Sequence, residues 1–273
     1  MPVLKRSTDY PLFDTHAHYN DHRFDPGEGA ETDGHDSVLN ALLADNVKHI
    51  VNVGTNLSTN LESIALAEKY PQIYAAAGIH PEDINPSDDM ESVMNALKEQ
   101  LSHSKVVALG EIGLDYHWDE PSRDIQKAWL RRQLLLARET GKPVIIHDRE
   151  AHGDIMDILH EFPDVTGVFH SFSASAEIAR QLVARGWYIS FSGVITFKNA
   201  ARLAEIVPTV PLDRVLIETD CPYLAPVPFR GKINHSGLME YTALRAAELY
   251  GIAPETFCRT VYENSMRFYD IND

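Results

Sequence analysis

The sequence predicts an α/β protein, and within that class a (β/α)8 TIM barrel that forms a single domain over residues 1–273. Two observations predict this fold. Short apolar runs alternate with longer stretches of helical period, and eight such pairs follow one another along the chain. The length of 273 residues also suits one barrel domain, since barrels of this class have about 250 residues.

The predicted strands are apolar runs rich in Val, Ile, Phe or Ala. They are Pro11–Thr15, His49–Val53, Ile73–Gly78, Val106–Glu111, Pro143–His147, Gly167–His170, Trp187–Phe191 and Val215–Thr219. Eight parallel strands are the number that closes a barrel. The alternative is an open doubly wound sheet. It is disfavoured because no glycine-rich phosphate-binding fingerprint follows the first strand.

The predicted helices lie between these strands and after the last one. They are Ser37–Asp45, Ser58–Lys69, Ser87–Leu101, Arg123–Thr140, Ala151–Glu161, Ser175–Arg185, Ala200–Val207, Ser236–Tyr250 and Pro254–Phe268. The segment Gln126–Thr140 gives the strongest signal, because its apolar residues recur at helical spacing and Gly141 with Pro143 stops it. The polar stretch Asp21–Asp36 is expected to be a long loop.

Composition limits the class of protein. Hydrophobic residues make up 44% of the chain and charged residues 23%, which is ordinary for a globular protein, and no apolar run is long enough to span a membrane. Met1–Tyr10 lacks the apolar core of a signal peptide. Two cysteines form no disulfide framework, which fits a reducing compartment, so we expect a cytoplasmic protein. No obligate protein partner is evident from the sequence. The net charge of −16 means that any attraction of an anionic substrate must be local.

Polar side chains stand at the carboxyl ends of the predicted strands, where barrels of this kind place their catalytic residues. Four ends carry histidine and two more carry a carboxylate. These residues are His16 and His18, His80, Glu111, His147, His170, and Glu218 with Asp220. A single histidine of this kind is more often a buried residue with a hydrogen-bond partner. Together, however, the strand ends converge on one mouth, and unliganded carboxylates gathered there would cost stability.

Strand geometry assigns different roles to neighbouring residues. Because side chains two apart in a strand face the same side, His16 and His18 can both point into the barrel mouth. Imidazole and carboxylate are ligands for borderline or hard divalent ions, so we expect a metal site there. Asp14 and Glu218 are better placed to orient a ligand through hydrogen bonds. Cys221 follows Asp220 without a paired base, and we interpret it as a packing residue.

The same strand ends carry motifs that resemble those of the TatD family of metal-dependent deoxyribonucleases. The motifs occur in order between residue 13 and about residue 235. They are Asp14-Thr15-His16-Ala17-His18, Gly78-Ile79-His80-Pro81, Gly110-Glu111-Ile112-Gly113-Leu114-Asp115-Tyr116, Pro143-Val144-Ile145-Ile146-His147, Phe169-His170-Ser171-Phe172 and Glu218-Thr219-Asp220-Cys221-Pro222-Tyr223-Leu224. Arg230-Gly231-Lys232 followed by Asn234 resembles a further motif of the family. Asp148, Ala174 and the segment His235-Ser236-Gly237 depart from the family pattern.

The resemblance implies a barrel of the metallo-dependent hydrolase type that holds two divalent metal ions. His16, His18 and Asp220 would hold one ion, His147 and His170 the other, and Glu111 would bridge them. The implied activity is 3′–5′ exonuclease cleavage of phosphodiester bonds in single-stranded DNA through a metal-activated water. Mg²⁺ is the implied ion in function, although the histidine-rich ligand set also suits Zn²⁺ or Mn²⁺.

Further residues are expected to serve catalysis and substrate binding. Asp220 would act as both ligand and proton acceptor. His80, Arg149, Arg230 and Lys232 are candidates for substrate binding. Tyr116, His117 and Trp118 are candidates for base stacking, and a packed loop is nearly as good an explanation of them.

Two other functions fit the same barrel. An amidohydrolase-type enzyme acting on an ester, lactone or amide would use the same ligands. A non-catalytic protein could keep the barrel as a scaffold, but such a scaffold should have lost ligands, and all six positions are filled.

Overall fold

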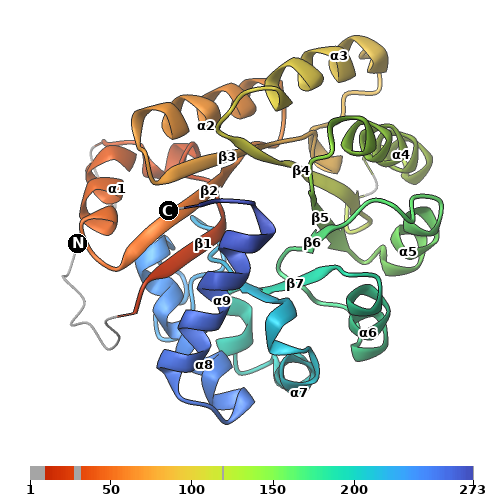
Figure 1. Ribbon diagram of the computed structural model, residues 1–273. Coiled ribbons are helices and arrows are strands. Elements are labelled where there is room, and N and C mark those ends of the chain that lie inside the picture. Colours follow the sequence, from red (N-terminus) through yellow and green to blue (C-terminus); the bar gives the residue numbers. More distant parts are fainter. Residues whose placement is uncertain (1–9, 28–31, 119, 273) are drawn as a thin grey trace. The chain divides into compact units, whose positions relative to one another are not determined.

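A computed structural model of the protein describes residues 10–27, 32–118 and 120–272. Eight parallel strands of these ranges form one sheet in the chain order β1 to β8. Their bounds are β1 Leu12–Ala17, β2 Val47–Val53, β3 Ile73–Ala77, β4 Val106–Asp115, β5 Val144–Arg149, β6 Gly167–Phe169, β7 Tyr188–Phe191 and β8 Val215–Ile217. The strands alternate with helices (Figure 1), so the predicted (β/α)8 barrel is confirmed.

The α-helices lie within two residues of the predicted bounds at most of their ends. They are α1 His35–Leu43, α2 Leu57–Lys69, α3 Met90–Leu101, α4 Arg123–Thr140, α5 His152–His160, α6 Ala176–Ala184, α7 Ala201–Ile206, α8 Met239–Tyr250 and α9 Pro254–Phe268. Local chemistry explains several ends. Asn56 caps α2 in a reciprocal capping box with Thr59, and Gly141 ends α4 in the left-handed conformation (φ 69°).

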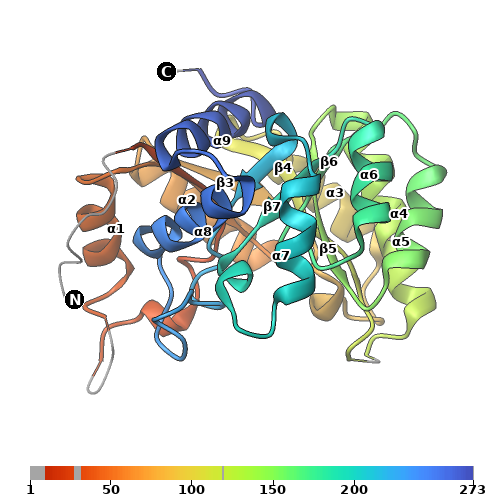
Figure 2. The same cartoon turned by 90° about the horizontal axis from the view of Figure 1, so that it is seen from below.

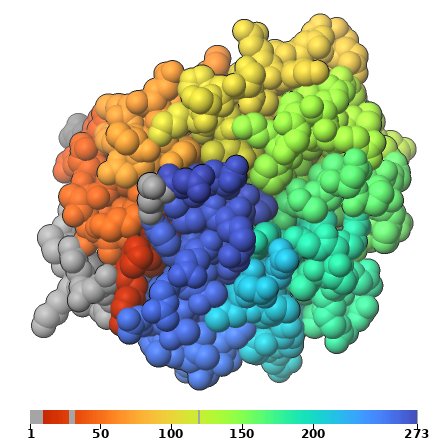
Figure 3. Space-filling view, viewed as in Figure 1, coloured from red at the N-terminus to blue at the C-terminus, as the bar shows by residue number. Residues whose placement is uncertain are grey.

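The chain divides into two compact units. The first unit contains residues up to Asn52 together with residues from Ile189 onward. In this unit α8 and α9 pack against each other and against β1 and β8, and their surfaces form one blue patch in the space-filling view (Figure 3). The backbone closes β8 onto β1: the Asp220 N–H donates to the His16 carbonyl (2.9 Å) and the His18 N–H to the Cys221 carbonyl (2.8 Å).

The second unit is the continuous segment Val53–Tyr188. Its strands are buried, and helices cover them: α2 packs on β3, α4 packs on β4, and α4 lies beside α5, as Figure 2 shows. Two buried side-chain amides tie strand ends to helices. The Gln133 amide pairs with the backbone of Ile79, and the Gln126 amide pairs with the backbone of Asp115. The unit therefore holds the ends of β3 and β4 firmly against α4.

Several predicted boundaries were wrong: β2 begins two residues earlier, β1 and β5 end two residues later, and α3 and α8 begin three residues later than predicted. β4 does not stop at Glu111 but continues to Asp115, because Gly113 to Asp115 pair with His147 to Arg149 of β5. β8 stops at Ile217, two residues early, because the backbone N–H and hydroxyl of Thr219 bond to the Asp14 carboxylate. The expected loop Asp21–Asp36 contains the short 3-10 helix η1 His22–Phe24 and the first residues of α1.

Some expectations concern residues outside the described ranges. Residues 1–9, for which we expect no signal peptide, lie outside them, as do residues 28–31 of the predicted loop. Within the described ranges, the helices are all too short or too polar to cross a membrane. The single-domain organisation over residues 1–273 stays a prediction.

Candidate metal centre

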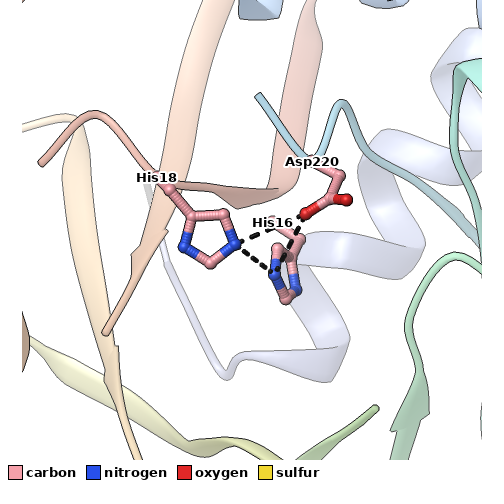
Figure 4. Close-up of side chains that lie close together, drawn as sticks. All are labelled: His16, His18 and Asp220. Atoms are coloured by element: carbon pink, nitrogen blue, oxygen red, sulfur yellow. Dashed lines mark hydrogen bonds and ion pairs between the residues drawn. The ribbon is translucent and has the colours of Figure 1, made fainter. Parts of the chain in front are cut away.

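The first cluster of metal-binding side chains lies in the first unit and contains His16, His18 and Asp220 (Figure 4). The two Nε2 atoms of the histidines are 3.0 Å apart. The Asp220 Oδ1 atom lies 3.4 Å from Nε2 of His18 and 3.7 Å from Nε2 of His16. Ligands about 2.1 Å from a tetrahedral ion stand about 3.4 Å from one another. These three atoms therefore fit one divalent ion.

The backbone and a buried carboxylate set the geometry of this first cluster. His16 lies in β1 and His18 directly after it, so both side chains fall on one face, as predicted. Asp14 is fully buried and accepts four hydrogen bonds: from the backbone N–H groups of His16 and Thr219, and from the hydroxyls of Thr219 and Ser236. Burial raises the pKa of Asp14 to about 6, although these hydrogen bonds act in the opposite direction. Asp14 thus holds the backbone on which the ligands stand.

The second cluster lies in the second unit around the carboxylate of Glu111, which is 4% exposed. Its Oε1 atom is 2.7 Å from Nδ1 of His147 and 2.7 Å from Nε2 of His170. Nε2 of His80 is 3.5 Å from the same oxygen. A carboxylate surrounded by imidazoles in a buried place suits a divalent ion, which lets the histidines stay neutral.

Asp115 is a site residue that the sequence reasoning missed. It is 1% exposed, and its Oδ2 atom is 3.0 Å from Nε2 of His147. His147 therefore presents Nδ1 to Glu111 and Nε2 to Asp115. Burial lowers the pKa of His147, but the bonds to Asp115 and Glu111 outweigh it and raise that pKa to about 9. The available signal was spacing, since Asp115 is four residues beyond Glu111 and shares its strand parity.

His80 is set apart by a backbone hydrogen bond to its Nδ1 atom. It precedes the 3-10 helix η2 Pro81–Asp83, and its Nδ1 atom accepts the backbone N–H of Glu82 (3.2 Å). Because Nδ1 uses its lone pair for this bond, the neutral ring carries its proton on Nε2, the atom that faces Glu111. A protonated nitrogen cannot ligate a metal. The geometry therefore suits His80 as a hydrogen-bond donor, the kind of group that the predicted substrate-binding role needs.

The other predicted residues are placed as follows. Arg149 ends β5 half exposed, with Nη1 3.8 Å from Oδ2 of Asp115. The Arg230 guanidinium lies over the Phe197 ring, 3.7 Å from its centroid, and Lys232 is exposed two residues later. Glu218 is buried and accepts a hydrogen bond from the Ser190 hydroxyl (2.5 Å). The predicted role of Glu218 in orienting a metal ligand stays a prediction.

The aromatic candidates after Glu111 separate into two kinds. Tyr116 is buried, donates to Asp154 (2.5 Å) and lies under the Arg123 guanidinium, so it is a packing residue. Trp118 is 56% exposed and its ring meets His117 edge-on. Cys221 is fully buried, and burial raises the pKa of its thiol, as expected of the packing residue predicted from the sequence.

Comparison with known proteins shows the family to which this chain belongs. Residues 13–270 match a family model described as TatD related DNase. The chain is 44% identical over 263 residues to a Bacillus subtilis protein, the uncharacterized metal-dependent hydrolase YabD, covering 96% of this chain and 100% of that one. It is 38% identical to the Escherichia coli metal-dependent hydrolase YcfH, covering 87% of this chain and 89% of that one.

Solved structures show the same architecture. A TatD homologue from Escherichia coli K12 superposes with a TM-score of 0.83 at 29% identity, covering 96% of this chain and 98% of that one. A TatD-family hydrolase from Entamoeba histolytica superposes with a TM-score of 0.84 at 22% identity, covering 97% of this chain and 100% of that one, which supports the fold. The family match spans nearly the whole chain, and the described ligand clusters suit divalent ions. The chain belongs to the TatD family of metal-dependent hydrolases.

Proposed function

We propose that this protein hydrolyses phosphodiester bonds of DNA, removing nucleotides from the 3′ end of single strands with the help of two divalent metal ions. The observation that carries the proposal is the pair of side-chain clusters, one of His16, His18 and Asp220 and one in which His147 and His170 contact Glu111. The description of the matching family as TatD related DNase supports the choice of substrate. Mg²⁺ is proposed as the ion in function, with Zn²⁺ or Mn²⁺ as alternatives.

Each cluster has a defined set of proposed ligands. His16, His18 and Asp220 hold one ion, while Glu111, His147 and His170 hold the other. Divalent ions bound in this way would polarise the phosphoryl group and lower the pKa of a water molecule. Glu111 as a bridge between the two ions stays a prediction from the family resemblance.

The protein's own groups supply the proton transfers and the orientation. Asp220 is only partly buried, and one of its two oxygens faces the histidines, so the carboxylate can also accept the proton of the attacking water. The Nε2–H of His80 is proposed to donate a hydrogen bond to an oxygen of the phosphate. Both groups stand on backbone that other residues hold: Asp220 through its bond to His16, and His80 through η2.

The substrate is a polyanion, whereas the protein carries a net charge of −16. Attraction must therefore come from individual cations. Arg149 at the end of β5, and Arg230 and Lys232 after β8, are proposed to contact phosphate groups of the strand. Trp118 remains the proposed stacking side chain because its indole ring is exposed.

A labelled-oligonucleotide digestion tests the proposal. The purified protein is treated with a chelator and then supplied with Mg²⁺, Mn²⁺ or Zn²⁺. A single-stranded oligonucleotide labelled at its 5′ end should yield a ladder of products that shorten one nucleotide at a time. The same strand labelled at its 3′ end should release labelled mononucleotide from the first turnover. Chelator without added metal should abolish both reactions.

Other outcomes would point elsewhere. Mononucleotide released first from the 5′ label would reverse the proposed polarity, and mid-strand fragments would replace the exonuclease with an endonuclease. If DNA stays intact while a panel of carboxylic esters, lactones and amides is hydrolysed with the same metal dependence, the deoxyribonuclease proposal is wrong and the amidohydrolase alternative stands.

A further inference from the structure

An arginine outside the ligand set stands beside the first cluster. Arg23 lies in the 3-10 helix η1, directly after the segment that carries His16 and His18. Its guanidinium carbon lies 4.2 Å from the centroid of the Tyr223 ring. The Tyr223 ring in turn meets the His18 ring at an interplanar angle of 80° with centroids 6.4 Å apart. A cation is thus held one aromatic ring away from a proposed metal ligand.

Asp21 fixes both partners of this stack. One of its oxygens accepts the hydroxyl of Tyr223 (2.9 Å), and the other accepts the backbone N–H of Arg23 (2.8 Å). Burial and the bond to Asp21 raise the pKa of Tyr223 to about 12, so the hydroxyl stays protonated and donating. The backbone N–H of Tyr223 also bonds to the Asp220 carbonyl (2.9 Å). The Tyr223 ring, on which Arg23 stacks, therefore belongs to the same loop as the proposed ligand Asp220.

The Arg23 guanidinium has N–H groups available to donate hydrogen bonds to a ligand. Among the described residues, its closest carboxylate contact is between Nε and Asp21 at 3.9 Å, which is too long for a hydrogen bond. In the described ranges its Nη atoms have no hydrogen-bond partner, and the side chain is 43% exposed. Stacking on an aromatic face restricts the orientation of a guanidinium and leaves its in-plane N–H groups available, which is the geometry that recognises phosphate.

We infer that Arg23, stacked on Tyr223, binds a phosphate group of the polynucleotide next to the one being cleaved. This inference rests on the proposed function, and it adds a subsite to it. The ligand is the pair of non-bridging oxygens of a backbone phosphodiester, met by the Nη groups of Arg23. Tyr223 is a positioning residue that acts through Arg23. The subsite favours strands with several phosphates over substrates that have a single phosphodiester.

The test compares two substrates that differ in flanking phosphates. The dinucleotide TpT contains one phosphodiester, whereas the ten-residue strand dT10 offers a neighbouring phosphate. Arg23→Gln should raise KM for dT10 about tenfold, the lower end for a hydrogen bond to a charged group, and leave TpT unchanged. The slope of log affinity against log salt should become about 0.7 less steep, as expected for one lost contact to a single strand. The KM of Arg23→Lys for dT10 should lie between those of the wild type and Arg23→Gln, because lysine keeps the charge but lacks the planar guanidinium.

A matched control is available on the second unit. The Arg138 guanidinium also lies over an aromatic ring, that of Phe162, 5.1 Å from the centroid. Arg138→Gln removes the same charge and the same kind of stack, and it should change neither substrate. If Arg23→Gln and Arg138→Gln behave alike, or if TpT and dT10 are affected equally by Arg23→Gln, the subsite is disproved.

Failure of the subsite is distinguishable from failure of the proposed function. Binding of fluorescent dT10 is measured by anisotropy in the presence of chelator, where no cleavage takes place. Weaker binding by Arg23→Gln than by Arg138→Gln supports the subsite even if the wild-type protein cleaves neither substrate, a result that would overturn the proposed function alone. Equal binding by the two variants overturns the subsite.

Discussion

Asp220 combines a strained backbone with two proposed duties. Its φ of 57° lies in the left-handed region, which a non-glycine residue occupies only when its surroundings enforce it. The enforcing contacts are the bond from its own N–H to the His16 carbonyl and the bond from the Tyr223 N–H to its carbonyl. The carboxylate is therefore directed at His16 and His18 by the backbone rather than by its own rotamer alone.

Asp220→Asn separates proton transfer from metal binding. The amide keeps an oxygen ligand but cannot accept a proton, so the rate should fall about 10²–10⁴-fold at saturating metal. Glu218→Gln should cost about 10–100-fold, and excess metal should partly restore its activity, because Glu218 is proposed to orient a ligand. The measurement is activity against metal concentration for both variants. Full rescue of Asp220→Asn by metal would show that Asp220 is only a ligand.

Asp115→Asn tests the orientation of His147. The Asp115 carboxylate accepts Nε2–H, which directs Nδ1 toward Glu111. An amide in its place should weaken metal binding at the second cluster by about 10–100-fold. Titration with Co²⁺, followed by its absorption spectrum, measures that affinity without requiring activity. Asp154→Asn is the control, since Asp154 contacts Tyr116 and Lys127 but no proposed ligand. Equal Co²⁺ affinity in both variants would show that Asp115 does not orient His147 for metal binding.

Sequence reasoning proposed all six ligands and the supporting residue Asp14, but it missed other contacts around them. The ligands His16, His18, Glu111, His147, His170 and Asp220 could be proposed because polar residues at strand ends are recognisable in sequence. Asp115 was missed because β4 was expected to end before it. Arg23 and Tyr223 were missed because they are 200 positions apart, and only the contact between the loops after β1 and β8 reveals the stack.

At the scale of elements, apolar runs predicted the order and type of the strands and helices. The predicted ends of strands were wrong in two situations. In one, a side chain competes for the backbone hydrogen bonds of the strand, and in the other the strand pairing continues through polar residues. Thr219 leaves β8 to bond with Asp14, whereas β4 extends because Gly113 allows β5 to approach closely. Neither effect is visible from hydrophobic periodicity, because both depend on which residue lies across from the strand.

Gly113→Ala tests that close approach. A Cβ at this position would lie 1.9 Å from the carbonyl oxygen of His147, and backbone cannot move aside cheaply. We expect the free energy of unfolding to fall by about 3 kcal/mol or more and Tm to fall by about 6 °C or more. Gly153→Ala is the matched control, because its Cβ would meet nothing within 4 Å inside α5, and it should be neutral or stabilising. Thermal unfolding measures both. Similar midpoints for the two variants would contradict the steric argument.

At the scale of the whole molecule, stability should depend on pH through His235. Burial lowers its pKa to about 4, and Nδ1 has no hydrogen-bond partner within the described residues. The unfolded chain, with an ordinary histidine pKa near 6.5, binds the proton more readily between pH 6.5 and 4. Folding stability therefore falls as pH drops through that window, by about 3 kcal/mol for this residue.

His235→Gln should remove this part of the acid sensitivity. The free energy of unfolding is measured in urea at several pH values between 7.5 and 4, and the variant should lose less of it than the wild type. His22→Gln serves as the control because the His22 side chain is 83% exposed. Parallel curves for wild type and His235→Gln would mean that the acid sensitivity arises elsewhere.

The discontinuity of the first unit governs the order in which the site can assemble during synthesis. Asp14 and Thr219, which brace the first cluster, are 205 residues apart, so about 10–40 s of translation at about 5–20 residues per second separates them. The four side chains of the second cluster all belong to one continuous segment and emerge within that interval. All side chains of the second cluster are thus synthesised before Asp220, the residue that completes the first cluster with His16 and His18. The nuclease we propose stays inactive until nearly its whole length has been made.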